Sequence, residues 1–336
     1  MKPNVVLYKT IPADQLARLQ AAFNLTRFDS ITDANRQAVI AALRHAQGLI
    51  GASHPIGNEL LDAAPGLRAI STISVGYDQF SVPELTRRGI TLMHTPGVLT
   101  ETTADTIFTL ILTSARRAVE LAELVKRGEW RRSIGEEYYG TDVNGKTIGI
   151  LGMGRIGYAV AKRAHLGFGM PVMYYNDKVN EQAESLLHAR RATLDQVLAE
   201  ADFVCVVLPL LPETEKLIGY AEISKMKPGA ILINGSRGKI INEPELIRAL
   251  QDGVIRGAGL DVFEQEPLPA TSPLLALPNV VALPHIGSAT HETRHAMVAC
   301  AVDNLIAALA GDVTQNCVNP GALRNVAATG NEFKGM

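Results

Sequence analysis

The chain has 336 residues, of which 47% are hydrophobic and 20% are charged, and its formal net charge is -2. At about 150 residues per domain this length predicts two domains, and the near-neutral charge gives no support for a nucleic-acid partner or an acidic surface as partner. We read no signal peptide at the N-terminus and no apolar run long enough to span a bilayer. The widely spaced Cys205, Cys300 and Cys317 fit neither a disulfide framework nor a metal cluster. We therefore expect a cytoplasmic protein without a metal site.

The first hundred residues alternate short apolar runs with amphipathic segments. Strands are expected at 5–8, 48–51, 67–73 and 91–93, with a weaker one at 25–28, and helices at 14–23, 33–45, 58–64 and 82–88. Strands that alternate with helices predict a parallel sheet covered on both faces. The turn 75–78 follows one of these strands, at the carboxyl edge where open parallel sheets bind ligands.

The segment 94–97, His-Thr-Pro-Gly, interrupts this alternation, and we place the first domain boundary there. One long helix is expected over 104–126, followed by an irregular, polar and aromatic segment at 130–139. Beyond it, strands are expected at 147–151, 172–175, 203–208, 230–234, 257–261 and 280–283, and helices at 158–166, 242–252 and 291–309. Cys205 lies inside one of these apolar runs and is expected to be buried. The tail beyond Pro320 carries no pattern.

A glycine motif follows the strand expected at 147–151. Gly152, Gly154 and Gly157 have the spacing G-x-G-x-x-G and lead into a helix. At a dinucleotide site the first glycine allows the turn off the strand, the second lets the backbone approach the pyrophosphate, and the third lets helix and strand pack closely. The motif alone is weak evidence, but its place between a strand and a helix favours a nucleotide site.

The next strand supports the same interpretation. It ends at Asn176 and Asp177, about 20 positions after the last glycine, where an acidic partner for a ribose hydroxyl is expected.

Three charged side chains follow the ends of successive strands in the second half of the chain. Arg237, Glu266 and His285 would all lie at the carboxyl edge of a parallel sheet, the edge that holds the cofactor. Arg237 would bind a substrate carboxylate bidentately and polarise the adjacent carbonyl. His285 would transfer a proton to or from the substrate oxygen, and Glu266 would hold the imidazole ring and raise its pKa.

Each of the three also has an ordinary structural interpretation. An arginine after a strand is typical of a surface salt bridge, Glu266 precedes Pro267 in an acidic loop, and His285 follows a proline and would serve as a cap. His291 and His295, four residues apart, indicate one helix face rather than a metal pair. Spacing alone leaves both interpretations of the three residues open.

Five motifs extend the pattern over nearly the whole chain. They are SVGYD at 74–78, the glycine motif at 152–157, N-x-x-RG at 234–238, GLDVF-x-x-EP at 259–267 and PHIGS at 284–288. Together they resemble those of the D-isomer-specific 2-hydroxyacid dehydrogenases. The resemblance implies an α/β fold with two domains and a cleft between them. Residues 1–98 and 288–336 would form a flavodoxin-like substrate domain, and residues 99–287 a Rossmann NAD(P)-binding domain.

The resemblance also implies roles for single residues. Arg237, Glu266 and His285 would be the catalytic set, and the amides of Val75 and Gly76 would hold the substrate carboxylate. The cofactor-binding set that it implies is Thr103, Gly152, Gly154, Arg155, Ile156, Gly157, Asn176, Asp177, Lys178, Pro209, Ser236 and Asp261. Asp261 would bind the nicotinamide amide. A homodimer is implied too, with the long helix and the segment around Trp130 at its interface.

Further motifs are similar to one subgroup, the bacterial reductases of glyoxylate, hydroxypyruvate and 2-ketogluconate. They include MHTP at 93–96, VLTET at 98–102, YGTDV at 139–143 and GSATHETR at 287–294. On this resemblance Arg294 is a further substrate contact. The activity implied is the NAD(P)H-dependent reduction of a 2-oxoacid to a D-2-hydroxyacid.

The choice between NADPH and NADH is the point at which this chain departs from the subgroup. NADPH-using members carry arginine after the second nucleotide strand, whereas this chain has Asn176, Asp177 and Lys178. A carboxylate repels a 2′-phosphate and accepts hydrogen bonds from a free ribose diol. A 2′-phosphate would then need Lys178, or Arg190 and Arg191 folded back, as its partners. We expect NADPH, with NADH as the alternative.

Other activities on the same scaffold remain open. Formate dehydrogenases share this fold but are similar to proteins with Gln at the position of Glu266. The glutamate in this chain therefore disfavours a formate dehydrogenase. Phosphite dehydrogenases keep the three catalytic residues, as do nucleotide-sensing corepressors, so these residues exclude neither.

Overall fold

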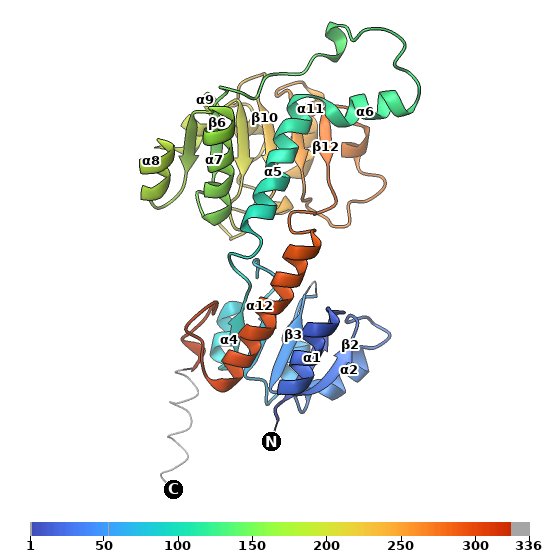
Figure 1. Ribbon diagram of the computed structural model, residues 1–336, viewed down its shortest axis with the longest axis vertical. Coiled ribbons are helices and arrows are strands. Elements are labelled where there is room, and N and C mark those ends of the chain that lie inside the picture. The colour runs from blue at the N-terminus through green and yellow to red at the C-terminus, as the bar shows by residue number, and fades with distance from the viewer. Residues whose placement is uncertain (1, 53, 324–336) are drawn as a thin grey trace. The chain divides into compact units, whose positions relative to one another are not determined.

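The computed structural model describes residues 2–52 and 54–323. The described chain forms two compact units, one of residues up to Leu99 together with those from Thr290 onward, and one of residues Thr100 to Ala289 (Figure 1). Each unit is an open, wholly parallel sheet with helices on both faces, so the expected α/β class is confirmed. In the described residues no helix is long and apolar enough to cross a membrane.

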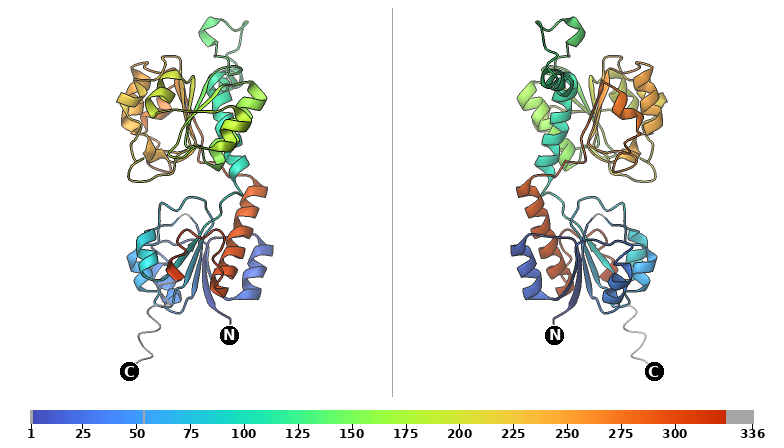
Figure 2. Two further views of the ribbon diagram at one scale, coloured as in Figure 1. Left: turned by 90° about the vertical axis from the view of Figure 1, so that its left-hand side faces the viewer. Right: turned by 90° about the vertical axis from the view of Figure 1, so that its right-hand side faces the viewer.

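The first unit is built on a five-stranded sheet in the order β2-β1-β3-β4-β5. Its strands are β1 (Asn4–Tyr8), β2 (Asn24–Phe28), β3 (Gly48–Gly51), β4 (Ala69–Thr72) and β5 (Thr91–Met93). Its helices are α1 (Ala13–Ala22), α2 (Arg36–Leu43), α3 (Asn58–Asp62), α4 (Val82–Arg87) and α12 (His291–Ala310). Helices α1 and α12 lie side by side on one face and α4 covers the other (Figure 2). Strands β3, β4 and β5 are buried throughout, and accordingly they contain no charged residue.

The second unit contains a seven-stranded sheet in the order β12-β11-β10-β9-β6-β7-β8. Its strands are β6 (Ile148–Leu151), β7 (Val172–Tyr175), β8 (Arg190–Arg191), β9 (Phe203–Val206), β10 (Ile231–Asn234), β11 (Gly257–Leu260) and β12 (Val280–Ala282). Its helices are α5 (Thr100–Ala115), α6 (Ala118–Lys126), α7 (Arg155–Phe168), α8 (Glu181–Leu187), α9 (Leu194–Glu200), α10 (Tyr220–Ile223) and α11 (Glu243–Gln251). The strand order reverses between β6 and β9, and such a switch point is where an open α/β sheet binds its ligand.

Two hydrophobic cores cover the two faces of this sheet. Successive residues of β10 alternate between them: Ile231 and Ile233 pack with α5 and α7, whereas Leu232 packs with α9 and α11. Cys205 lies fully buried in the first core, as expected, and burial raises the pKa of its thiol. Strands β6, β9 and β10 are therefore packed from both sides, and candidate site residues follow the carboxyl ends of these strands.

The single helix expected over 104–126 is wrong. The chain forms two helices that are separated at Arg117, which has a left-handed φ of 53°. The Arg117 side chain donates to Glu120 at 2.7 and 2.8 Å and to the Glu137 carbonyl at 2.6 Å, so side-chain bonds stabilise the break. The Ala115 carbonyl at the end of α5 accepts the Thr141 amide at 2.8 Å.

Several short elements were not expected from the sequence. They are the two-residue strand β8, helices α8, α9 and α10, and three 3₁₀ turns at Glu136–Tyr138, Gly238–Ile240 and Pro273–Ala276. Most of the tail beyond Pro320 lies outside the described residues.

Candidate active site

The glycine motif turns the chain between β6 and α7 and leaves no space for side chains at two of its three positions. Gly152 has a φ of +104°, and a Cβ there would lie 2.7 Å from the Val207 carbonyl oxygen. A Cβ on Gly157 would lie 2.1 Å from the Gly152 carbonyl oxygen, because α7 begins directly against the end of β6. Glycine is required at both positions by the backbone itself.

Gly154 is different, because a Cβ there would meet nothing within 4 Å and would point into open space. It is the N-cap of α7 and supplies no side-chain cap to the helix. The first turn reads Arg-Ile-Gly-Tyr from Arg155, so it contains no acidic side chain. Amides at the start of a helix have no partner within the helix and attract anions. This open, electropositive helix start fits the pyrophosphate of a dinucleotide.

Two asparagines brace the middle of the glycine motif. The Asn176 side chain accepts the Met153 amide at 3.2 Å and donates to the Lys178 carbonyl at 2.9 Å. The Asn180 side chain donates to the Met153 carbonyl at 2.9 Å and also caps α8 by accepting the Ala183 amide. Asn176 therefore joins the glycine turn to the loop after β7. Asn180 was not singled out from the sequence, because its partner is recognisable only in the folded turn.

Of the two arginines on β8, only one folds back towards the end of β7. The Arg191 guanidinium donates to the Asn176 carbonyl at 3.0 Å and to the Asp177 carbonyl at 2.6 Å. Arg190 instead forms an ion pair with Glu200. A permanent positive charge thus lies beside the backbone of Asp177, whose own side chain is exposed, as is that of Lys178.

His285 and Glu266 form a hydrogen-bonded pair. The His285 Nδ1 lies 2.6 Å from one Glu266 carboxylate oxygen, and the other oxygen accepts the Phe263 amide at 3.0 Å. Burial alone would raise the pKa of Glu266, but the His285 hydrogen bond, the Phe263 amide and the charges of His285 and Arg237 together lower it. Because an ionised carboxylate only accepts, Nδ1 carries a proton and Nε2 is left for another partner.

Arg237 is presented by a turn that a buried asparagine shapes. The Asn234 side chain accepts the Ser236 amide at 3.1 Å and donates to the Arg237 carbonyl at 3.0 Å. The Arg237 guanidinium in turn donates to the Ser236 carbonyl at 2.9 Å. The Ser236 hydroxyl donates to the Leu208 carbonyl, next to Pro209, so these two candidate cofactor residues lie close together.

Asp261 holds the backbone that follows His285. It is almost fully buried, and its carboxylate accepts the amides of Ile286 at 2.7 Å and Gly287 at 2.8 Å. Burial raises the pKa of Asp261, an effect that the two amides partly offset. The Thr103 hydroxyl donates to the Gly287 carbonyl at 3.0 Å. These bonds hold His285 in a left-handed conformation with a φ of 52°.

The remaining candidates, Val75, Gly76 and Arg294, belong to the first unit. Val75 and Gly76 form the turn after β4, and Arg294 lies in the first turn of α12. The candidate catalytic residues and the whole candidate cofactor set belong to the second unit.

Known proteins share this architecture and sequence. The family model described as "D-isomer specific 2-hydroxyacid dehydrogenase, NAD binding domain" matches residues 108–287. The chain belongs to the D-isomer-specific 2-hydroxyacid dehydrogenases. It is therefore an oxidoreductase of the NAD(P)-dependent class, as the sequence motifs implied.

Individual known proteins resemble the chain over nearly its full length. A glyoxylate/hydroxypyruvate reductase B of Yersinia enterocolitica is 60% identical over 96% of this chain and 99% of its own. An NADPH-dependent glyoxylate/hydroxypyruvate reductase of Sinorhizobium meliloti, solved with NADP and malonate, is 32% identical with a TM-score of 0.84. This match covers 96% and 98% of the two chains. The TT0316 protein of Thermus thermophilus is 41% identical, with a TM-score of 0.85 over 94% and 99%.

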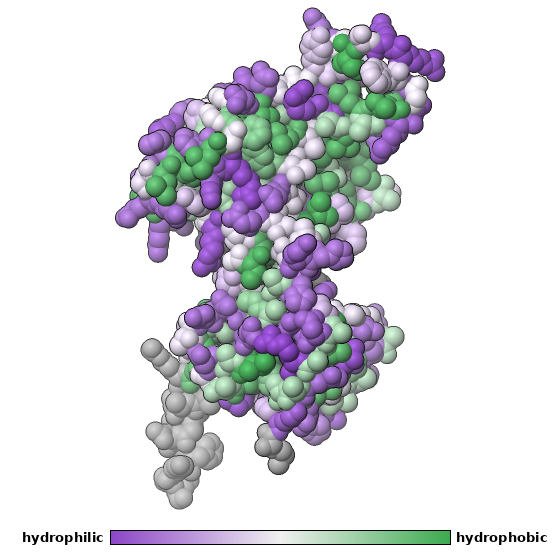
Figure 3. Space-filling view, in the orientation of Figure 1, coloured by the Kyte–Doolittle hydropathy of each residue, from purple (hydrophilic) through white to green (hydrophobic). Residues whose placement is uncertain are grey.

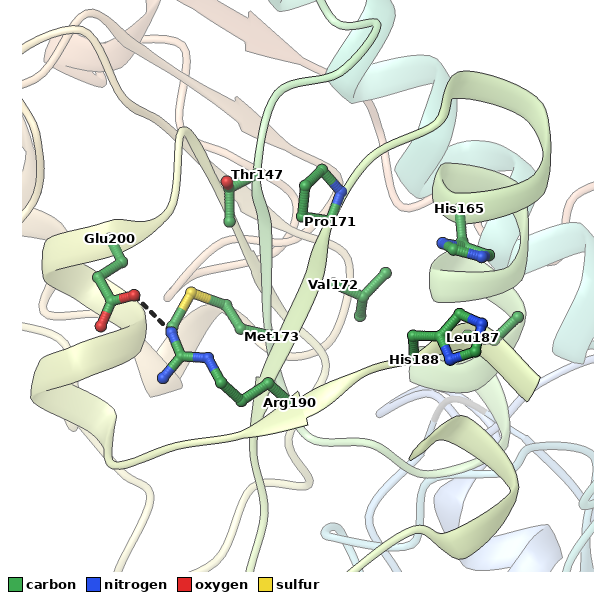
Figure 4. Close-up of a pocket in the computed structure, with 9 residues that line it drawn as sticks. All are labelled: Thr147, His165, Pro171, Val172, Met173, Leu187, His188, Arg190 and Glu200. Atoms are coloured by element: carbon green, nitrogen blue, oxygen red, sulfur yellow. Dashed lines mark hydrogen bonds and ion pairs between the residues drawn. The ribbon is translucent and has the colours of Figure 1, made fainter. Parts of the chain in front are cut away.

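A cavity of about 380 Å³ lies at the amino-terminal edge of the seven-stranded sheet, opposite the carboxyl edge that carries the candidate site residues (Figure 4). Thr147 and Pro171, which precede β6 and β7, line it together with His165 and His188. The two imidazole rings lie edge to face, with 5.9 Å between their centroids. Apart from Arg190, which the sequence offered as a partner for a 2′-phosphate, no candidate cofactor or catalytic residue lines it, and the described residues contain no group of three or more side chains suited to a metal.

Proposed function

We propose that this dehydrogenase reduces small 2-oxoacids, glyoxylate and hydroxypyruvate above all, to D-2-hydroxyacids and prefers NADPH. The observation that carries the proposal is the 2.6 Å contact between His285 and Glu266 on the same sheet that carries the open glycine turn. The relatives named as glyoxylate/hydroxypyruvate reductases support the choice of substrate. 2-Ketogluconate is a further candidate substrate, which rests on the subgroup motifs.

The reaction needs one proton at the substrate oxygen. A bound nicotinamide supplies the hydride that the carbonyl carbon accepts. Because Glu266 occupies Nδ1 of His285, the proton transferred to the carbonyl oxygen comes from Nε2, and water returns it afterwards. The ionised Glu266 stabilises the positively charged ring before the transfer and keeps its orientation fixed. In the oxidative direction the neutral ring takes the proton back.

Arg237 binds the substrate carboxylate and polarises the carbonyl beside it. Its guanidinium remains charged at every relevant pH, and its fork matches a carboxylate. The amides of Val75 and Gly76 and the side chain of Arg294 complete the substrate set. In this proposal residues 1–98 and 288–336 form the substrate domain, and residues 99–287 the NAD(P) domain.

The cofactor is held at the start of α7 and beside β7. The cofactor-binding set remains the one that the resemblance implied: Thr103, Gly152, Gly154, Arg155, Ile156, Gly157, Asn176, Asp177, Lys178, Pro209, Ser236 and Asp261. The Asp261 carboxylate already accepts two backbone amides, so its contribution to the nicotinamide site includes the position of His285. The amides of Arg155 and Ile156 face the pyrophosphate.

The preference for NADPH rests on Arg191. Its guanidinium is fixed at the end of β7 by two backbone carbonyls, and Lys178 adds a second positive charge on the same loop. Together they outweigh the single negative charge of Asp177. Arginine pairs well with a phosphate because several N–H groups point the same way.

We also propose a cytoplasmic homodimer assembled through α6 and the segment that follows it. Within 119–139 five large hydrophobic side chains are exposed: Val119, Val125, Trp130, Ile134 and Tyr139. Hydrophobic residues lie among charged ones on this part of the surface (Figure 3). Exposed apolar patches of this kind mark protein interfaces. Light scattering on a size-exclusion column would give twice the chain mass of 36.1 kDa, and a monomer would contradict the proposal.

The direct test is oxidation of NADPH and of NADH by the purified protein with glyoxylate, hydroxypyruvate and 2-ketogluconate in turn. We expect turnover with glyoxylate and hydroxypyruvate, a D-configured product from hydroxypyruvate, and a higher kcat/KM with NADPH. Measurable NADPH binding without turnover of any of the three acids would contradict the proposal and favour another acid or a nucleotide-sensing role.

A further inference from the structure

The turn after β4 is held from one side by the segment that follows the neighbouring strand β5. The Ser74 carbonyl accepts the Thr95 amide at 2.9 Å, and the Val75 carbonyl lies 3.0 Å from Nδ1 of His94. The Gly76 carbonyl accepts the Ser74 hydroxyl at 2.7 Å. Three successive carbonyls of this turn are therefore bound.

Binding a carbonyl also sets the direction of the next amide. In a trans peptide the C=O and the following N–H point in opposite directions. The bond from His94 to the Val75 carbonyl thus aims the Gly76 amide away from the imidazole ring. Within the described part of the chain, the amides of Val75, Gly76 and Tyr77 donate to no protein group. They form a short row of oriented donors, which suits an anion.

His94 is itself held firmly enough to orient this row. Its amide donates to the Asn316 carbonyl at 3.0 Å, and its carbonyl accepts the side chain of the buried Asn304 at 2.7 Å. Its ring meets the Tyr77 ring edge to face, with 5.6 Å between centroids. Because the Val75 carbonyl can only accept, Nδ1 must carry the proton.

We propose that His94 is a positioning residue that acts through the Val75 carbonyl and aims the Gly76 amide at the carboxylate of the 2-oxoacid. The inference deepens the proposed function and rests on it. His94 contributes to substrate affinity rather than to the chemical step, because it contacts the backbone of the turn and takes no part in proton transfer.

Two substitutions separate the hydrogen bond from the ring contact. His94→Asn places an amide nitrogen near the position of Nδ1 and keeps a donor for the Val75 carbonyl. His94→Phe keeps an aromatic ring against Tyr77 and removes the donor. His45 is an exposed histidine of the same unit, and His45→Phe is the matched control.

The first measurement is the dissociation constant of malonate, a small dicarboxylate, from the NADPH-loaded protein, followed by the kinetics with glyoxylate. We expect His94→Phe to weaken malonate binding and raise KM about tenfold, with kcat changed less than threefold and NADPH affinity unchanged. His94→Asn should stay within about threefold of the wild type in both constants, since the amide–carbonyl bond is restored. Equal malonate affinity in all variants, or a loss confined to kcat, would overturn the proposal.

A second measurement does not depend on activity or on a folded variant. Nitrogen NMR of the wild-type protein labelled at histidine would assign the tautomer of His94. We expect the Nδ1–H form, and an Nε2–H form would overturn the proposal. A wild type without turnover would contradict the proposed function, and the tautomer and malonate binding would still decide the role of His94.

Discussion

Asp261 fixes the backbone beside His285 by accepting the next two amides of the chain, those of Ile286 and Gly287, at 2.7 and 2.8 Å. An asparagine has only one acceptor, so Asp261→Asn would place an N–H against an N–H. We expect kcat to fall at least tenfold and unfolding free energy to drop by about 1–3 kcal/mol. Glyoxylate kinetics and denaturant unfolding would measure both. Asp142→Asn, outside the candidate site, is the control, and an unchanged kcat would contradict the role of Asp261.

His285 transfers the proton in the proposed reaction. Asparagine tolerates left-handed backbone better than most residues, so His285→Asn preserves the φ of 52° while removing the imidazole. We expect turnover to fall about 10²–10⁴-fold, the usual contribution of a general acid, with NADPH affinity unchanged. Stopped-flow fluorescence would measure cofactor binding separately from turnover. Retained activity would contradict the assignment.

The pH dependence should report on Glu266. Its pKa is lowered, so its negative charge is present beside His285 at all pH values above the ordinary carboxyl range. Its contribution to stability is likewise complete above that range and is lost as the pH falls through the lowered pKa. In Glu266→Gln the charge is absent while the acceptor for Phe263 remains, so the protonated ring loses its partner. We expect kcat/KM for reduction to fall as a result, with a changed dependence on pH. Superimposable pH profiles would contradict this role.

Arg237 should affect both binding and reaction. Arg237→Ala removes the carboxylate partner and the charge that polarises the carbonyl, so we expect KM for glyoxylate to rise about tenfold or more and kcat to fall. Arg237→Lys keeps the charge without the fork and should recover only part of the loss. Steady-state kinetics would test whether Arg237→Lys falls between the wild type and Arg237→Ala. Unchanged kinetics in Arg237→Ala would exclude Arg237 as the partner of the substrate carboxylate.

Arg191 and Asp177 should shift cofactor preference in opposite directions. Arg191→Gln keeps a donor for the carbonyls of Asn176 and Asp177 but removes the charge, so kcat/KM with NADPH should fall about tenfold while the value with NADH changes little. Asp177→Asn should raise the preference for NADPH. Arg190→Gln is the matched control, because Arg190 pairs with Glu200 instead. An unchanged ratio in Arg191→Gln would contradict our proposal.

Most strands of the two sheets could be predicted because they are buried on both faces and read as short apolar runs, such as 231–233 and 203–206. Strand β8 could not, since it consists of two exposed arginines at the edge of the sheet. The break at Arg117 was missed for a related reason. A left-handed residue is usually glycine or asparagine, whereas here bonds to Glu120 and Glu137 stabilise an arginine in that conformation.

At the candidate site, strand ends indicated where charged side chains would gather, and the structure brings Glu266 to His285. The sequence could not reveal the hydrogen bonds that hold the surrounding turns in place. Asn234 and Asn180 act through bonds to backbone atoms three and 27 residues away, and such partners are defined only by the folded turn. The sequence offered Arg190 and Arg191 equally as partners for a phosphate. The structure distinguishes them, because Arg190 forms an ion pair with Glu200 at the end of α9, whereas Arg191 bonds to the Asp177 carbonyl.

The bond between the Thr141 amide and the Ala115 carbonyl closes the excursion formed by α6 and the aromatic segment after it. Residues 116–140 therefore begin and end at the same place within the second unit, and none of them belongs to a strand of its sheet. The exposed hydrophobic residues of this segment, which form the proposed subunit interface, can therefore be exchanged without altering a strand that carries the candidate active site. In the proposed dimer, subunit assembly and chemistry would therefore depend on separate parts of this unit.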